Sequence, residues 1–306
     1  MNVLLLGSGG REHAMAWKLS QSSLLSKLYV APGNAGTEQI ATNVSLNPMD
    51  FSAVDRYIRR NSINMLIVGP EAPLVAGIVD YFEESNKHKD LVVIGPPKAG
   101  ALLEGSKDFA KAFMARHNIP TADYQTFKSG ELKQAKAHLD KINPPYVIKA
   151  DGLAAGKGVI ITEDRQKAES TLEDMLENSS LGEAGTKVVI EQFMDGIEVS
   201  SFVVTDGTAY KILPSAKDYK RANDGDTGPN TGGMGSIYYP DMVNDKDILL
   251  CHETNEKVIE LLQNDTKCKY RGIIYGSFMK TKSGEIKIIE YNCRFGDPEC
   301  INLMHM

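Results

Sequence analysis

The sequence predicts a parallel α/β domain followed by an α+β region, in two or three domains. Its first hundred residues alternate short apolar runs with helix-like segments, which is typical of a doubly wound parallel sheet. After residue 120, strand-like runs follow one another across short connections, which favours an antiparallel or mixed sheet. The length of 306 residues is enough for more than one hydrophobic core.

The amino-terminal region carries four apolar runs that end in or next to Gly or Pro, and we expect them to be parallel strands. They are residues 3–7, 27–33, 65–71 and 91–97. Helical periodicity occupies 12–20 and 51–61, and a longer helical stretch at 105–120 is closed by Pro120. In such a sheet, the loops at the carboxyl ends of the strands form the edge that binds ligands.

The rest of the chain is predicted to hold a second domain of mixed structure. Its expected strands are 146–152, 158–162, 187–193, 199–207, 272–280 and 286–294, and its expected helices are 164–177 and 247–263. Residues 215–235 contain five glycines and mixed charges, and we expect a long loop there. A structureless run of this length in a compact domain is either functional or disordered.

Composition and charge narrow the classes of function. Apolar residues make up 42% and charged residues 24%, which excludes a disordered or collagen-like chain. The net charge of −6 disfavours non-specific nucleic-acid binding. No apolar run reaches the ~20 residues of a membrane span, and four scattered cysteines indicate neither zinc nor necessary disulfides. We therefore expect a cytoplasmic protein that acts on small molecules, without nucleic-acid or membrane partners.

The sequence GSGGRE lies between the first strand and the first helix, where backbone N–H groups and the helix dipole favour an anion. The dinucleotide-binding fingerprint needs glycine at the sixth position, but Glu12 stands there. The second strand ends in Ala31 and Pro32 rather than in an acid that would hold an NAD ribose. Nicotinamide binding is therefore disfavoured, while a phosphate-binding turn and a purely structural tight turn both stay open.

Residues 151–159, DGLAAGKGV, differ from a P-loop because the glycine spacing is too short and Lys157 precedes Gly158 and a strand. A glycine-rich hairpin remains, which can fold over a triphosphate while Lys149 supplies a point charge. The alternative is a mobile hairpin with a lysine that reaches solvent. Further on, Glu191 ends an apolar strand beside Phe193 and suits an adenine, as a second acid suits ribose hydroxyls.

The run IKIIEYNCRFGDPE is the sharpest local signal. Strand alternation puts Glu290, Asn292 and Arg294 on one face. The carboxylate and amide oxygens suit Mg²⁺, and the guanidinium could steady a phosphoryl or acyl group. The alternative is a solvent-facing polar stripe on an edge strand. In the 215–235 segment, Asp218, Lys220 and Arg221 could meet a zwitterionic substrate.

Taken together, the motifs resemble those of a known family. GSGGREHA, APGNAGT, VGPEAPLVAGIVD, GSKDFAK, IPTADY, VIKADGLAAGKGV, VIEQFMDG, DYKRANDGDTGPNTGGMG and EYNCRFGDPE occur in this order. They resemble the glycinamide ribonucleotide synthetases (phosphoribosylamine–glycine ligases), an ATP-grasp family of purine biosynthesis. The resemblance implies a pre-ATP-grasp domain at 1–103, a linking helix at 104–125, a lid subdomain at 126–194 and a core subdomain at 195–306.

The resemblance also implies roles for the matching residues. For ATP they are phosphate contacts by Lys107 and Lys149, a closing hairpin with Gly152, Gly156, Lys157 and Gly158, an adenine hinge of Glu191, Gln192, Phe193 and Met194, and a ribose contact by Glu198. For the other ligands they are Mg²⁺ or Mn²⁺ binding by Glu290 and Asn292, glycine contacts by Asp218, Lys220 and Arg294, and phosphoribosylamine contacts by Gly10, Arg11 and Glu12. Lys149, Asp218 and Arg294 would take part in catalysis.

The implied reaction joins glycine to 5-phosphoribosylamine through glycyl phosphate, with ATP becoming ADP and phosphate. Another acid or amine, or ATP binding without turnover, is the alternative, and a nicotinamide-dependent oxidoreductase ranks last.

Two departures from the family stand out. Tyr219 replaces the usual histidine of the DYKR block, and the chain ends at Met306, so we expect a missing carboxyl-terminal domain of roughly a hundred residues. A monomer is the default expectation, since no pattern specifies an oligomer.

Overall fold

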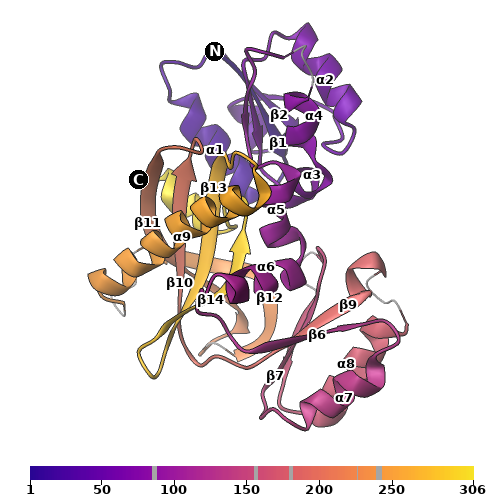
Figure 1. Ribbon diagram of the computed structural model, residues 1–306. Coiled ribbons are helices and arrows are strands. Elements are labelled where there is room, and N and C mark those ends of the chain that lie inside the picture. Colours follow the sequence, from indigo (N-terminus) through magenta and orange to yellow (C-terminus); the bar gives the residue numbers. More distant parts are fainter. Residues whose placement is uncertain (85–87, 155–157, 179–181, 226, 239–242) are drawn as a thin grey trace. The chain divides into compact units, whose positions relative to one another are not determined.

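The computed structural model describes residues 1–84, 88–154, 158–178, 182–225, 227–238 and 243–306 (Figure 1). The chain forms two compact units. Unit 1 consists of Met1–Ala101, Val199–Gly276 and Asn292–Met306, and unit 2 of Leu102–Glu198 and Ser277–Tyr291. Each unit is built from segments distant in sequence, and the domain boundaries expected at 103, 125 and 194 stay predictions.

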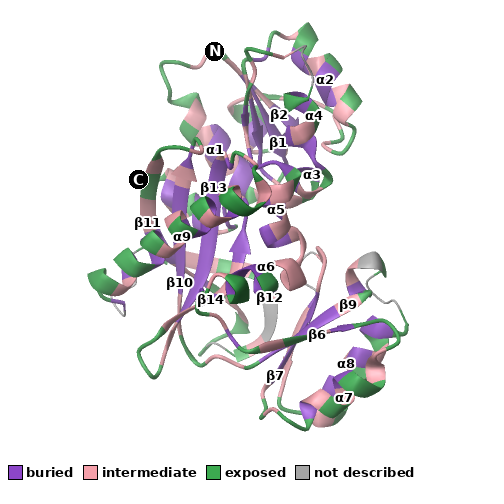
Figure 2. Cartoon of the chain, in the orientation of Figure 1, coloured by how far each residue is buried: buried purple, intermediate pink, exposed green. Residues whose placement is uncertain are grey.

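The predicted parallel α/β sheet is confirmed in unit 1. Its order is β3 (Thr42–Asn43), β2 (Lys27–Pro32), β1 (Asn2–Gly7), β4 (Met65–Val68) and β5 (Val92–Ile94), and every neighbouring pair is parallel. The central strand β1 is buried along most of its length (Figure 2). Its side chains alternate between two cores, since Leu4 and Leu6 pack on one face and Val3 and Leu5 on the other. Strands of parallel sheets are apolar runs because both faces are covered.

Helices supply the cover for this sheet. Those of the first hundred residues are α1 (Gly10–Ser20), α2 (Phe51–Arg60), α3 (Glu71–Ala76), α4 (Ile78–Glu83) and the start of α5 (Lys98–Gly105), with a short 3₁₀ turn at Thr37–Gln39. Val54 and Ile58, one turn apart on α2, are buried in one core, and Met15 and Ala16 of α1 lie in the other. The helix α2 begins at its Asp50 cap, whose carboxylate accepts from the Ala53 N–H.

A second sheet has the order β12 (Thr227–Tyr238), β11 (Tyr210–Asn223), β10 (Gly196–Thr205), β13 (Gly272–Thr281) and β14 (Ile286–Asn292). The helices α9 (Asp245–Thr266) and α10 (Glu299–Met304) follow β12 and β14 along the chain. In unit 1, Phe202 of β10 and Ala216 of β11 are buried in the same core as Val3 and Leu5 of β1.

The loop expected at 215–235 is wrong, because most of this segment is paired strand. The strands β11 and β12 are antiparallel, with Asp218 opposite Ser236 and with register shifts on either side of Arg221. Ladder hydrogen bonds and these bulges accommodate a glycine-rich sequence that has low strand propensity. At Gly233, φ is +133° and an added Cβ would lie 2.5 Å from Pro298 Cδ, so glycine is required there.

Unit 2 contains a four-stranded antiparallel sheet. Its order is β6 (Tyr124–Lys128), β9 (Lys187–Glu191), β7 (Tyr146–Ala150) and β8 (Val159–Thr162). The helices α7 (Leu132–Leu139) and α8 (Arg165–Leu176) lie side by side over one face and bury Leu139, Leu172 and Ile148 in a common core (Figure 1). The end of α5, the helix α6 (Lys107–Arg116) and a 3₁₀ turn at Gly182–Gly185 complete the unit's helical elements among the described residues.

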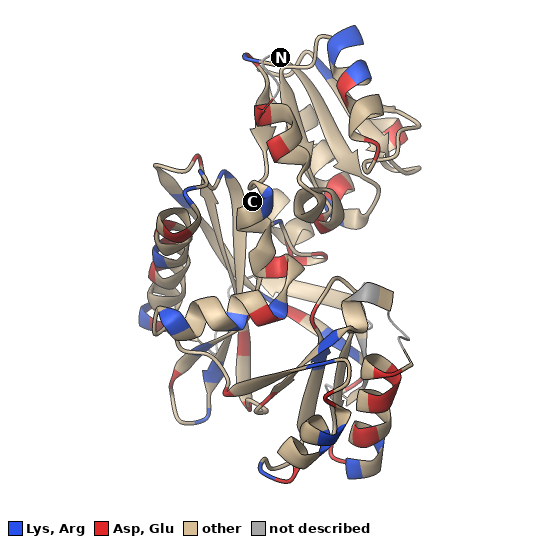
Figure 3. Ribbon diagram, turned by 45° about the vertical axis from the view of Figure 1, so that its right-hand side comes forward, with Lys and Arg blue, Asp and Glu red and all other residues tan. Residues whose placement is uncertain are grey.

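Acidic and basic side chains are interspersed along the outer helices rather than separated by sign (Figure 3). On α8, Arg165 and Glu169 form an ion pair one turn apart. None of the described helices combines the length and the apolarity that crossing a lipid bilayer requires.

A close backbone contact in unit 2 gives a test of the fold. A Cβ on Gly196 would lie 2.0 Å from the Lys280 carbonyl oxygen. We therefore expect Gly196→Ala to lower the free energy of unfolding by about 1–3 kcal/mol, because the two chain segments must move apart. Urea unfolding measures this, with Gly232→Ala as the control, since a Cβ there meets nothing within 4 Å. Equal stability of the two variants would contradict the contact.

Candidate active site

A buried cluster of lysines around Glu191 is the main polar feature of unit 2, and we call Lys107, Lys111, Lys149 and Glu191 the lysine cluster. In the β7–β9 ladder, Val147 lies opposite Glu191, so Lys149 and Glu191 project from the same face. The Lys149 Nζ donates to Glu191 Oε2 at 3.0 Å. The same oxygen lies 3.1 Å from Lys111 Nζ. The Lys149 side chain is therefore buried in an ion pair and does not reach solvent.

The cap of helix α6 places Lys107 in this cluster. Ser106 is the N-cap residue, and its hydroxyl accepts from the Phe109 N–H. The Asp151 carboxylate, just after β7, accepts from the Ser106 hydroxyl at 3.0 Å and from the Asp108 N–H at 2.8 Å. These bonds tie the start of α6 to the end of β7, and Lys107 is the first residue of the helix.

The environment changes the acidity of two of the lysines. Burial lowers the pKa of the Lys107 ammonium, although the Glu290 carboxylate opposes this effect. Burial likewise lowers the pKa of Lys111, and the Glu191 carboxylate opposes it most strongly. The two carboxylates offset only part of the cost of burying these ammonium groups. The site is therefore suited to an anionic ligand, which would add further negative charge beside them.

The glycine-rich hairpin begins as expected, at the ends of two paired strands. The Ala150 N–H donates to the Gly158 carbonyl at 2.7 Å, one step beyond the β7–β8 ladder. Gly152 lies against Ala184, where a Cβ would come within 3.0 Å of the backbone. Gly156 and Lys157 lie outside the described residues, so their expected phosphate contacts stay predictions.

The expected adenine hinge follows β9. Residues 192–195 have no regular structure and connect β9 to β10, and the Gln192 N–H donates to the Asp123 carbonyl at 2.8 Å. Phe193 and Met194 are half-buried, and so is Glu198 on β10. The second oxygen of Glu191, Oε1, is buried and has no hydrogen-bond partner in the described structure. This oxygen and the backbone of the hinge are acceptors for a ligand.

The expected metal ligands lie at the end of β14. Glu290 and Asn292 are two positions apart on this strand, so they share a face. Asn292 is buried and Glu290 half-buried, so the pair is not the solvent-facing stripe of the alternative interpretation. Two oxygen-bearing side chains fit a divalent cation that takes its other ligands from phosphate and water. Among the described residues, no group of three or more His, Cys, Asp or Glu side chains is positioned to hold a metal.

The expectation that Arg294 shares this face through strand alternation is wrong. The strand ends at Asn292, and the next two residues form a bend. The FGDP sequence that follows is turn-forming, so it interrupts the pleat. Arg294 instead belongs to a polar network in unit 1.

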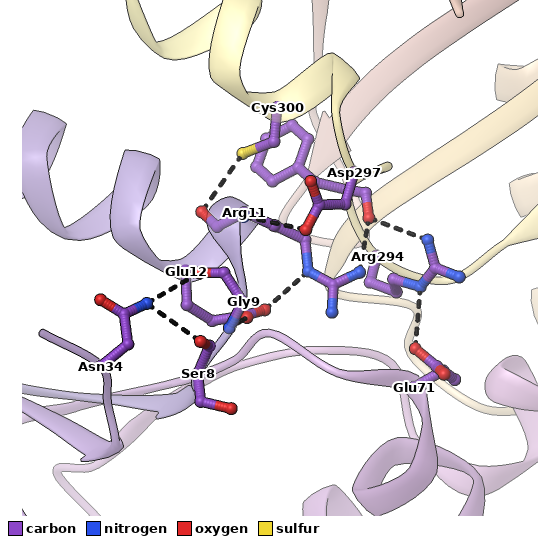
Figure 4. A network of polar contacts seen from close by, with 10 residues as sticks. Ser8, Gly9, Arg11, Glu12, Asn34, Glu71, Arg294, Asp297 and Cys300 are labelled. Carbon is purple, nitrogen blue, oxygen red and sulfur yellow. Dashed lines mark hydrogen bonds and ion pairs between the residues drawn. The ribbon is translucent and has the colours of Figure 1, made fainter. Parts of the chain in front are cut away.

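This network, the arginine network, contains Arg11, Glu12, Glu71 and Arg294 (Figure 4). These residues surround the carbonyl of Phe295. Both guanidinium groups donate to the Phe295 oxygen, each at 3.0 Å. Each also pairs with its own carboxylate, Arg11 with Glu12 at 2.6 Å and Arg294 with Glu71 at 3.1 Å. The network brings together the turn after β1, the start of α3 and the segment after β14.

The backbone donors of the turn after β1 are occupied by carboxylates of the protein itself. The Gly9 N–H donates to Glu12 Oε2 at 2.7 Å, and the Arg11 N–H donates to Asp297 Oδ2 at 3.1 Å (Figure 4). A phosphate at these donors would have to displace two carboxylates. The geometry therefore favours the structural turn over a phosphate-binding turn.

Asp218 lies in a second polar group of unit 1. It is 8% exposed on β11, and its Oδ2 lies 3.4 Å from Lys220 Nζ. Nearby, the Tyr275 hydroxyl donates to Glu299 Oε1 at 2.8 Å. Burial raises the pKa of Tyr275 well above its ordinary value, and the Glu299 carboxylate adds to this effect. Tyr275 therefore stays neutral, and its hydroxyl donates a hydrogen bond to Glu299.

Tyr219, the next residue, lies on the other face of β11 from Asp218. It is partly exposed, and the Lys217 ammonium lies 5.0 Å from the centre of its ring. Arg221 donates to the Gly228 carbonyl at 2.9 Å, which ties it to the β11–β12 hairpin.

Sequence reasoning missed several residues of these groups, namely Lys111, Glu71, Asp297, Asp151 and Glu299. Lys111 had a usable signal, because it lies four residues after Lys107 and therefore on the same side of the helix. The others become visible only when strands distant in sequence are brought together.

The fold is that of the ATP-grasp proteins. Residues 1–104 match the phosphoribosylglycinamide synthetase N domain, and residues 105–300 match the ATP-grasp (A) domain of the same enzyme. The chain therefore belongs to the phosphoribosylglycinamide synthetase family.

Individual relatives agree with this assignment. The chain is 47% identical over 309 aligned residues to a phosphoribosylamine–glycine ligase of Haemophilus influenzae, which covers 99% of this chain and 70% of the relative. It resembles the crystal structure of a phosphoribosylamine–glycine ligase from Thermotoga maritima with a TM-score of 0.81 and 34% identity, over 98% of this chain and 71% of that one. A biotin carboxylase–nucleotide complex from Campylobacter jejuni shares the fold alone, at 15% identity and a TM-score of 0.74 over 99% of this chain and 67% of that one.

The arginine network predicts a pH dependence of stability. Burial raises the pKa of Glu71, but Arg294 and Arg11 outweigh it and hold the pKa below the ordinary 4.5. Stability from this carboxylate is therefore present above pH 4.5 and is lost as the pH falls through the lowered value. We expect Glu71→Gln to cost about 1 kcal/mol at pH 7 and progressively less towards pH 3.

Urea unfolding of wild type and variant across this pH range measures the difference. The control is Glu38→Gln, which removes an exposed carboxylate from the same unit. A Glu71→Gln effect that stays constant with pH would contradict the charge pairing.

Proposed function

We propose that this chain binds ATP in the lysine cluster and catalyses the joining of glycine to 5-phosphoribosylamine, which gives glycinamide ribonucleotide, ADP and phosphate. The observation that carries the proposal is the match of residues 1–300 to both domains of the phosphoribosylglycinamide synthetase family. The site geometry adds to it, because it supplies buried cations for phosphates, an oxygen pair for a cation and two arginines for anionic substrates.

The lysine cluster supports the ATP part of the proposal. Lys107 and Lys149 would contact the phosphates, Glu191–Met194 would hold adenine, and Glu198 would bind ribose. Lys149 shares the Glu191 carboxylate with Lys111, so its ammonium charge is only partly neutralised and would still attract an anionic ligand. Ammonium groups in a water-poor site attract phosphate oxygens more strongly than exposed lysines do.

Glu290 and Asn292 would hold a divalent cation beside the phosphates. Such a cation would neutralise part of the phosphate charge and polarise the γ-phosphoryl group. We propose Mg²⁺ rather than Mn²⁺, because magnesium is commonly bound through one or two protein groups plus substrate phosphates. Lys107 lies close enough to Glu290 to feel its charge, so the metal and phosphate contacts would adjoin one another.

The chemistry that fits these groups has two steps. The glycine carboxylate attacks the γ-phosphorus of ATP, the bond to the β–γ bridging oxygen breaks, and glycyl phosphate and ADP form. The amine of phosphoribosylamine then attacks the glycyl carbonyl, inorganic phosphate leaves, and a proton is lost from nitrogen. Asp218 would hold the glycine ammonium, Arg294 would steady the carboxylate and the developing charge, and Arg11 would hold the phosphoribosyl group. Rate enhancement of this kind comes from positioning and electrostatic stabilisation.

The experiment that tests the function is ADP release in the presence of Mg²⁺, ATP, glycine and phosphoribosylamine generated in place, with each omitted in turn. ADP that forms only in the complete mixture supports the ligase. ATP binding without ADP release would overturn the ligase activity of this chain. ADP release with another acid or amine would reassign its substrates.

We also propose that the protein is a monomer and that it acts in the cytoplasm.

We expect Lys149→Ala to weaken ATP binding by about 10- to 100-fold, because it removes one charge-assisted hydrogen bond to phosphate. The fold should persist, since Lys111 still pairs with the buried Glu191. Titration calorimetry measures the affinity, and Lys133→Ala, at an exposed position of α7, is the control. Unchanged ATP affinity would reject the phosphate role of Lys149.

We expect Glu290→Gln to lower turnover by about 10²- to 10³-fold, the range for loss of one group that stabilises transition-state charge. It should also raise the Mg²⁺ concentration needed for half-maximal activity. Glu285→Gln, at an exposed position before β14, is the matched control and should leave both values unchanged. A Glu290→Gln variant with normal Mg²⁺ dependence would reject the metal site.

A further inference from the structure

Lys111 is the most deeply buried of the three lysines in the lysine cluster, and the proposed reaction gives it no role. It is 2% exposed, and its Nζ donates to the Thr121 hydroxyl at 2.8 Å and lies 3.1 Å from Glu191 Oε2. The Thr121 hydroxyl in turn donates to the Ile288 carbonyl at 2.7 Å. Lys111 thus connects α6, β9 and β14 within unit 2.

The charges that touch one another in this cluster do not balance. One carboxylate oxygen, Glu191 Oε2, accepts from two ammonium groups, and the other oxygen of Glu191 has no partner in the described structure. Two positive charges therefore share one negative charge in a site where all three side chains are at most 6% exposed. The Asp151 carboxylate is committed to the cap of α6. Among the described residues, Glu290 is the other carboxylate whose charge acts on Lys111, and it is the proposed metal ligand.

A buried surplus of charge is costly unless a partner of opposite charge is supplied. The proposed ligand supplies one, because the phosphate chain of ATP is anionic. If Glu191 paired with Lys149 alone, the pair would be neutral and Lys149 would attract a phosphate less strongly. Lys111 competes for the same carboxylate oxygen and prevents this neutralisation.

We propose that Lys111 is a positioning residue for nucleotide binding, which acts by sharing Glu191 Oε2 with Lys149 and so leaves the Lys149 ammonium only partly compensated for the ATP phosphates. The inference rests on the proposed function, since it takes Lys149 as a phosphate contact. Lys111 itself touches Glu191 and Thr121 and not the nucleotide.

This role differs measurably from a structural one. A residue that only stabilises the fold would, when removed, lower the melting temperature and leave ligand affinity unchanged or weaken ATP and adenosine alike. A residue that controls the charge of the phosphate site affects ATP but not adenosine, which has no phosphates. Because a neutral pair is easier to bury than a charged triplet, removal of Lys111 should not lower the melting temperature of the ligand-free protein.

The experiment compares the ratio of ATP affinity to adenosine affinity in the full chain by titration calorimetry. The variants are Lys111→Met, which keeps length without charge, and Lys111→Gln, which keeps a donor for Thr121. We expect both to lower the ratio by about tenfold or more, which corresponds to about 1.4 kcal/mol. Lys133→Met, at an exposed position, is the matched control and should keep the wild-type ratio.

A double variant tests the charge argument directly. In Lys111→Met/Glu191→Gln, the competing cation and the shared carboxylate are both gone, so Lys149 is again uncompensated. We expect the ratio to return to at least the wild-type value, even if the change at the adenine hinge alters both affinities. A ratio that stays as low as in Lys111→Met overturns the inference.

The outcomes separate this inference from the proposed function. Wild-type protein that fails to bind ATP overturns the proposed function and the inference with it. Wild-type protein that binds ATP, with an unchanged ratio in the folded Lys111→Gln or Lys111→Met variant, overturns the inference alone. A lowered ratio without a lowered melting temperature supports it.

Discussion

The Glu191 carboxylate is the interaction on which the architecture of unit 2 depends. It ends the strand β9, whose three central residues are apolar and buried, so it is carried into the interior together with Val189 and Ile190. A buried carboxylate is stable only if cations come to it, and Lys149 and Lys111 bring β7 and α6 to the end of β9. The sheet, the helix that carries Lys107 and the connection to β10 are all arranged around this one acid.

Unit 1 stabilises its charged side chains by a different arrangement. Its buried charges form pairs of neighbours, and a neutral backbone oxygen lies between the two guanidinium groups of Arg11 and Arg294. Arginine suits this site because its planar fork can donate to a carboxylate and to a carbonyl at once. The lysine cluster shares one carboxylate between charges, whereas the arginine network gives each charge its own. The first arrangement places two ammonium groups on one carboxylate, and the second pairs each guanidinium with a separate carboxylate.

Much of the fold could be predicted from the sequence. The strands β1, β4, β7 and β9 are apolar runs between turn residues, and burial on both faces explains why their pattern is legible. Residues 210–238 could not be predicted in this way, because their strands are held by ladder pairing and bulges rather than by apolar side chains. Short elements such as β6 and α7 were missed for a related reason, since their half-exposed sequences carry little periodicity.

Site residues could be predicted where they lie within one continuous motif. They could not be predicted where the fold brings together segments that are distant in the sequence. Lys149 and Glu191 were found near strand ends and Glu290 on the polar face of an expected strand, and the structure brings the first two into contact. Alternation failed for Arg294 because the strand stops two residues earlier. The carboxylate of Asp297 at the turn after β1 could not be foreseen, since it is 286 residues away from the Arg11 N–H from which it accepts.

The oxygen between the two guanidinium groups belongs to the main chain. The spacing of Arg11 and Arg294 is thus set by the peptide unit of Phe295, whose ring lies in the core with Phe202 and Cys300. A scan that replaces side chains one at a time removes either arginine or the ring, but it always leaves the acceptor in place. The carbonyl oxygen that holds the two guanidinium groups together therefore cannot be removed by side-chain mutagenesis. Only a change to the backbone, such as replacement of the amide that follows Phe295, would alter it.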